Sequence, residues 1–147
     1  MRRPVAFVTA IVLFVEAVGI VLVNGVLATV AGNQSMSLAG MDPDAMVTGT
    51  WVMGGVSGVL LVLCGLIPLL AGIRDRAPGR FGRITLIACA VVHGVLGALA
   101  VGLIGWAAFA FLMAVLALVV LTLVAFDRRE PETKAEEPGV EGTPAPV

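Results

Sequence analysis

The chain begins with two long apolar segments separated by a short polar one. The first segment covers residues 5–31 and is interrupted only by Glu16 and Asn24. The second covers residues 47–73 and carries no charged residue. A run of about 20 apolar residues is long enough to cross a bilayer as a helix. Each of these segments therefore predicts one transmembrane helix.

A third apolar segment, residues 84–126, has no Asp, Glu, Lys or Arg along its whole length. As a single helix it would be roughly twice as long as the hydrocarbon core is thick. Gly102 and Gly105 stand near its middle, where glycines allow the backbone to turn sharply. We therefore expect two helices here, over residues 84–102 and 106–126.

Composition supports a membrane protein and excludes two other classes. Of the 147 residues, 59% are hydrophobic and 13% are charged, whereas about 25% are charged in a typical soluble domain. So few charges cannot cover the exterior of a water-soluble globule. Nucleic-acid binding is also disfavoured, because the net charge is −1 and no basic face can be assembled.

These patterns predict an all-α fold, an integral membrane four-helix bundle over residues 1–126. Residues 127–147 differ sharply, because they are rich in Pro and Glu and almost free of large apolar side chains. Such a segment buries too little apolar surface to fold. We expect it to be a disordered acidic tail.

The basic residues indicate the orientation in the membrane. With four spans, all nine fall on one side, and Asp42 and Asp44 fall on the other. Positively charged loops stay in the cytoplasm, so both termini are predicted to be cytoplasmic. The prevalence of Ala, Gly, Val and Arg is typical of GC-rich bacterial coding and indicates a bacterial inner membrane. The basic residues are Arg2, Arg3, Arg74, Arg76, Arg80, Arg83, Arg128, Arg129 and Lys134.

The first segment has an alternative interpretation as a cleaved signal peptide, because Arg2 and Arg3 precede it and residues 29–31 loosely resemble a cleavage site. A signal peptide has an apolar core of about 7–15 residues. The run here is about twice that length, which favours a retained helix.

Small residues recur at helical spacing in the second and third predicted helices. In lipid, small residues let helices approach closely enough for dispersion contacts. We expect these two helices to pack on each other within one bundle, and an interface between copies of the chain is the alternative. The positions are Gly54, Gly58, Gly65 and Gly72 in the second helix, and Ala90, Gly94, Ala98 and Gly102 in the third.

Four polar or reactive residues lie inside the apolar segments and form a candidate intramembrane polar site. Glu16 is ~16 Å and His93 ~14 Å along their helices from the cytoplasmic side, and Cys64 shares that depth. These three residues are expected to form one layer if their helices face inward. Asn24, eight residues beyond Glu16, would extend the polar track outward.

Three interpretations of this layer stay open. In the first, a hydrogen bond between Glu16 and His93 fixes helix register. In the second, Glu16 exchanges a proton as a substrate arrives. Ligand binding is the third, but haem would need Met113 or a second chain as its other axial ligand, and zinc would need a partner beyond Glu16, Cys64 and His93. No cofactor or metal is predicted.

Two minor hypotheses concern sulfur. The predicted outer loop holds Met36, Met41 and Met46, and thioethers suit Cu(I), although such methionines more often pack against apolar surface. Cys64 and Cys89 would permit a membrane redox protein, but their predicted depths differ by roughly 5–6 Å.

The sequence around Glu16 resembles one known family. Small multidrug-resistance transporters are short four-helix proteins with a membrane-embedded Glu in the first helix and a Gly three residues later. Glu16 and Gly19 match that element. The resemblance implies a shared proton and cation site at Glu16. It is confined to residues 16–19, and the chain contains no Tyr.

No arrangement typical of an enzyme is found, since the chain has one His and no paired carboxylates within its apolar segments. We therefore predict a non-enzymatic structural or accessory subunit of a membrane assembly. Its expected partners are the lipid bilayer and either further copies of the chain or a larger membrane protein. The alternative is a proton-coupled transporter of small molecules or cations that uses Glu16.

Overall fold

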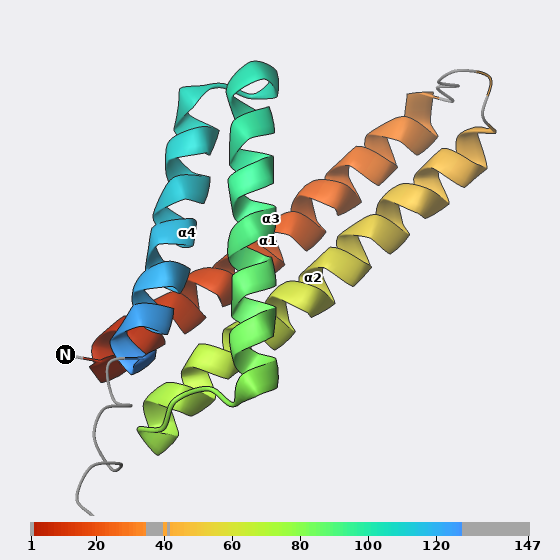
Figure 1. The fold of residues 1–147 in the computed structure, drawn as a ribbon. Helices are drawn as coiled ribbons and strands as arrows, with labels where there is room; N and C mark the ends of the chain where they lie inside the picture. Colours follow the sequence, from red (N-terminus) through yellow and green to blue (C-terminus); the bar gives the residue numbers. More distant parts are fainter. Residues whose placement is uncertain (1, 35–39, 41, 128–147) are drawn as a thin grey trace, which may run out of the picture.

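The computed structural model describes residues 2–34, 40 and 42–127, and within them it contains four α-helices and no strand (Figure 1). Each helix is long and apolar enough to cross a membrane. The prediction of an all-α protein with four such helices is therefore confirmed. The predicted tail lies outside the described residues, apart from Asp127. The helices are α1 (Arg2–Gln34), α2 (Pro43–Arg74), α3 (Arg80–Leu103) and α4 (Trp106–Asp127).

Local sequence explains where the helices begin and end. Asp42 caps α2, because its Oδ1 accepts a hydrogen bond from the backbone N–H of Asp44 at 2.8 Å, and Pro43 occupies the first helical position. At the turn between α3 and α4, Gly105 has a φ of +115°, which an L side chain rarely adopts. Both features agree with the sequence pattern.

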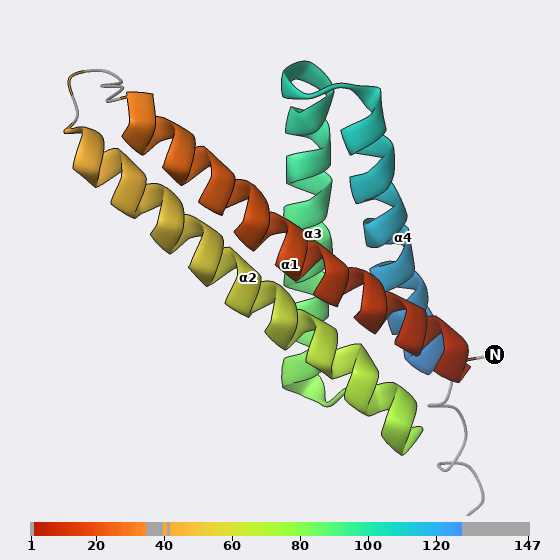
Figure 2. The same cartoon turned by 180° about the vertical axis from the view of Figure 1, so that it is seen from behind.

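The helices form two hairpins, α1–α2 and α3–α4, and the axes of the two hairpins are inclined to each other where they cross (Figures 1 and 2). The hairpins meet at the end that holds the start of α1, the α2–α3 turn and the end of α4, called here the arginine-rich end. Toward the opposite end they diverge. With 33 and 32 residues, α1 and α2 are about 50 Å long, against about 35 Å for α3 and α4 with 24 and 22. Greater tilt lets the longer helices span the same thickness.

The glycines of α2 pack against α1, so the prediction that α2 and α3 meet through their small residues is wrong. A Cβ at Gly54 would lie 2.5 Å from Asn24 Cβ, and one at Gly58 would lie 2.5 Å from Val21 Cγ2. Gly65 likewise contacts the side chain of Phe14 on α1. These glycines allow the two backbones of the first hairpin to approach closely.

The small residues of α3 divide between α4 and open surface. Gly94 contacts the side chain of Leu116 on α4, and Ala90 packs against the buried core. Ala98 is exposed, and Gly102 has nothing within 4 Å of its Cβ position. The actual contact face is rotated relative to the predicted stripe. Its buried members are Leu86, Cys89, His93, Gly97 and Ala100.

The core lies where the two hairpins cross. Its larger cluster draws buried residues from α1, α3 and α4, and α2 contributes Cys64 and Ile67 at its edge. A smaller cluster joins α1, α2 and α4 closer to the arginine-rich end. The members are Leu13, Leu86, Cys89, Val115 and Val119 in the larger cluster and Ala6, Ala71 and Phe126 in the smaller one.

Candidate intramembrane polar site

Glu16 of α1 and His93 of α3 are hydrogen-bonded to each other across the crossing of the two hairpins. His93 Nε2 lies 3.0 Å from Glu16 Oε2 and 3.2 Å from Oε1. The side chains are 4% and 14% exposed for His93 and Glu16. Helix geometry places both residues on faces turned toward the other hairpin, so the pair joins the two halves of the molecule.

The contact between His93 Nε2 and the Glu16 carboxyl group requires one proton, in addition to the proton on Nδ1. His93 Nδ1 lies 2.8 Å from the carbonyl oxygen of Cys89, which can only accept, so Nδ1 must carry a proton. A neutral imidazole then has no proton on Nε2, yet Nε2 faces two carboxyl oxygens. Either Nε2 or Glu16 must therefore be protonated. In both cases Glu16 and His93 together have no net charge, which lowers the cost of burying them in lipid.

Two thiols lie beside this pair. Cys89 Sγ is 3.6 Å from His93 Nδ1, one helical turn away on α3. Cys64 of α2 packs against the core cluster that contains Cys89. The expected depth difference assumes upright helices, whereas α2 is inclined relative to α3 (Figure 1).

Asn24 does not join Glu16, His93 and the thiols. Its amide donates to the carbonyl oxygen of Ile20, one turn back on α1, at 2.8 Å. Its Cβ packs against Gly54 of α2. Asn24 therefore faces the other helix of its own hairpin, whereas Glu16 faces α3. The predicted layer brings together Glu16, His93 and Cys64, and Cys89 is an additional member.

A second polar contact between the hairpins was missed from the sequence. Thr9 of α1 and Thr122 of α4 are fully buried, and their hydroxyl oxygens are 2.9 Å apart. Each also lies within hydrogen-bond distance of the Leu118 carbonyl oxygen, at 3.2 Å and 2.9 Å. The available signal was that both are hydroxyl residues inside otherwise apolar segments, where they form hydrogen bonds between helices.

Possible metal ligands are sparse in the part of the chain that the structure describes. No group of three or more His, Cys, Asp or Glu side chains there is arranged to hold a metal ion. Met113, the haem ligand considered above, packs with its Cε against Gly97 between α3 and α4. Met46 lies in the first turns of α2, and Met36 and Met41 lie outside the described residues.

Comparison with protein families, with curated proteins and with solved structures finds no match. The resemblance to small multidrug-resistance transporters thus rests on residues 16–19. Within that element, Glu16 is paired with His93, and Gly19 has nothing within 4 Å of its Cβ position.

Proposed function

We propose that this chain is a non-enzymatic structural or accessory subunit of a bacterial inner-membrane assembly. The observation that carries the proposal is the divergence of the two hairpins. They contact each other near the arginine-rich end and at the Glu16–His93 pair, and beyond the pair each helix packs within its own hairpin (Figure 2). The other hairpin therefore leaves apolar side chains of α1 and α3 beyond the pair exposed, and we call these faces, which include Val23, Leu27 and Leu96, the wedge.

Residues beyond the pair support a protein-sized occupant of the wedge. Val23 and Leu27 follow Glu16 by seven and eleven residues, so they share its face of α1. Both are 55% exposed, although Glu16 on the same face is nearly buried. On α3, Leu96 lies one turn beyond His93 and is 47% exposed. A helix from another subunit would fit against these walls by dispersion contacts.

The polar pair suits a structural role. Both ring nitrogens of His93 have partners, and Glu16 accepts or shares the proton of Nε2. A satisfied buried polar pair fixes the register between helices. In the proposed role, Glu16 and His93 join the hairpins at their crossing, and the wedge beyond the pair stays available to its occupant.

Site-specific photo-crosslinking in the native membrane tests this proposal. A photoreactive residue at Val23 or Leu27 should give a crosslink to one discrete protein, either a second copy or a larger subunit. The matched control is Val18, which is 61% exposed on the opposite side of the same helix and should react with lipid alone. Equal protein crosslinking at Val18 and Val23, or none at either wedge position, would refute the assignment.

The proposal includes an orientation with both termini in the cytoplasm. The α2–α3 turn carries Arg74, Arg76 and Arg80, whereas the start of α2 carries Asp42 and Asp44. This asymmetry supports the positive-inside assignment. Single-cysteine labelling of variants that lack the native thiols should label residues 32–44 from outside, and residues 76–83 and 133 only after permeabilisation. External labelling of residue 133 would overturn the orientation.

Proton-coupled transport is the second candidate, and the shared proton of the Glu16–His93 pair favours it. A coupling carboxyl must lose and regain a proton, which an amide cannot do. Glu16→Gln should therefore give a folded chain without substrate-driven proton movement if the chain is a transporter. A structural pair predicts normal assembly in the same variant. Proton flux in proteoliposomes, with wild type as the control, separates the two functions.

A further inference from the structure

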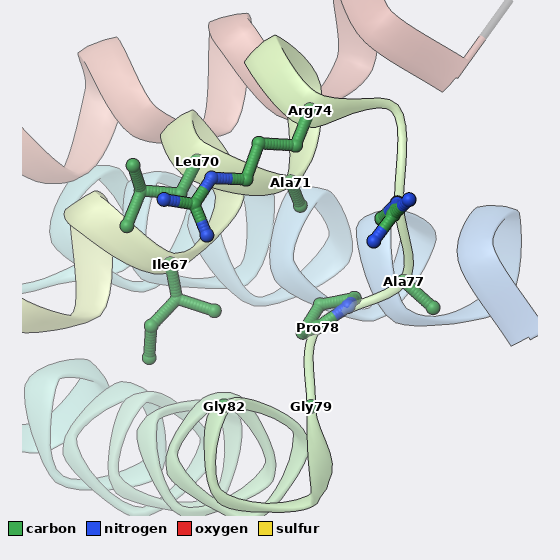
Figure 3. Close-up of a pocket in the computed structure, with 9 residues that line it drawn as sticks. Ile67, Leu70, Ala71, Arg74, Ala77, Pro78, Gly79 and Gly82 are labelled. Carbon is green, nitrogen blue, oxygen red and sulfur yellow. The ribbon is translucent and has the colours of Figure 1, made fainter.

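A pocket of about 300 Å³ opens at the arginine-rich end between α2 and α3. Its lining includes the apolar side chains of Ile67, Leu70 and Ala71, with Arg74 beside them (Figure 3). Arg76 also lines the pocket. The pocket therefore combines an apolar lining with two cationic side chains, at the level where the apolar span of α2 ends.

The start of α3 packs closely against α2 and the preceding turn where these elements line the pocket. A Cβ at Gly82 would lie 3.1 Å from Ile67 Cγ2 and 3.1 Å from Pro78 Cβ. Gly82 thus lets α3 approach α2 closely at this point. Arg74 folds back over the pocket toward Leu70 and Ile67 instead of extending away from the protein (Figure 3).

The two arginines that line the pocket lack acidic partners within the described residues. Asp75 is the acid of this turn, and its Oδ2 lies 3.5 Å from Arg3 Nη2 on α1. Arg74 and Arg76 take part in no ion pair in the described part of the chain. Among the described residues the pocket therefore offers positive charge without an unpaired carboxylate in its lining, which favours an anion and disfavours a zwitterionic head group.

We propose that this pocket binds the head group of an anionic phospholipid. The arginines would contact the phosphate, and the glycerol backbone and first acyl carbons would cover Ile67 and Leu70. Basic pockets between membrane helices bind anionic head groups in this way. The site is separate from the Glu16–His93 pair and does not depend on the proposed subunit role.

Native mass spectrometry of the full-length chain in detergent tests the proposal. The probes are phosphatidylglycerol, phosphatidylcholine with the same acyl chains, and inorganic phosphate. One saturable phosphatidylglycerol adduct is expected, with weaker binding of both other probes. Binding of inorganic phosphate as tight as that of the lipid would identify a phosphate site instead, and equal binding of the two lipids would overturn the anionic selectivity.

Matched variants locate the site. A surface arginine contributes a factor of about five to binding of an anionic head group, so Arg74→Gln with Arg76→Gln should weaken phosphatidylglycerol binding about 25-fold. Arg80→Gln removes the same charge from the same end, outside the pocket, and should have a smaller effect than Arg74→Gln. Leu70→Gln keeps every charge but makes the apolar lining polar, and it should weaken the phosphatidylglycerol adduct. An equal loss with Arg80→Gln, or unchanged binding in Leu70→Gln, would refute the pocket.

Discussion

Removing the Glu16–His93 contact should reveal strong energetic coupling between the two hairpins. In the single variants Glu16→Leu and His93→Leu, the remaining partner keeps a buried polar group without its hydrogen bond. Such a loss costs about 1–3 kcal/mol. In the double variant both polar groups are gone and leucines fill the space, so the cost of an unpaired group is removed.

The structure sets the expected size of the coupling. Nε2 approaches both carboxyl oxygens, at 3.0 and 3.2 Å, and the site is almost closed. Measured hydrogen bonds between membrane helices average about 0.6 kcal/mol and reach about 1.7 kcal/mol. We place this pair in the upper half of that range. The other His93 bond, to the Cys89 carbonyl, is local to α3 and does not contribute to the coupling.

The assay is reversible unfolding of the four proteins in mixed micelles, followed by circular dichroism. The double variant should be more stable than the sum of the two single losses predicts, by about 1–1.7 kcal/mol. A control cycle pairs His93→Leu with Val18→Leu, a lipid-facing change on α1 that should be additive. If the Glu16–His93 cycle is also additive within about 0.5 kcal/mol, the contact does not join the hairpins.

Three further predictions concern helix packing. Gly54→Ala should destabilise the chain by about 1–3 kcal/mol through overpacking against α1, whereas Gly55→Ala, which has open space at its Cβ, should be near neutral in the same unfolding assay. Oxidation with copper phenanthroline should join Cys64 to Cys89 within one chain, and two free thiols that persist under denaturing titration would contradict their proximity. Thr122→Val should lower stability by about 0.6 kcal/mol, and an unchanged unfolding midpoint would show that its hydroxyl contact with α1 contributes nothing.

The sequence contained enough information to predict four apolar helices, although three of them begin three or four residues before the predicted spans. Apolar length identifies membrane spans because unpaired backbone groups are not tolerated in lipid. The cap at Asp42 and the turn at Gly105 depend on neighbouring residues alone, and both could be predicted for that reason. Which helix packs against which could not be predicted in the same way. A stripe such as Gly54 and Gly58 shows that some helix approaches closely, but it does not specify which one.

The depth of a residue in the membrane can be predicted only approximately from its position in the sequence. Counting residues from the membrane edge assumes upright helices, and the inclined first hairpin changes that distance for α1 and α2 alike. The predicted contact between Glu16 and His93 tolerates this error, because their expected depths differ by only about 2 Å. Residue counting gives Cys64 and Cys89 different depths, and it gives no signal for Thr9 because a hydroxyl in an apolar run has no distinctive spacing.

The unequal lengths of the hairpins connect the shape of this protein to bilayer thickness. The apolar part of α1 is about 40 Å long and must tilt strongly to match a hydrocarbon core of about 30 Å, whereas α4 matches it nearly upright. In a thicker bilayer, hydrophobic mismatch favours a smaller tilt of α1 and α2. The first hairpin would then rotate about its crossing with the second, and the angle between them would narrow. Bilayer thickness would therefore set how far apart the outer halves of the helices stand.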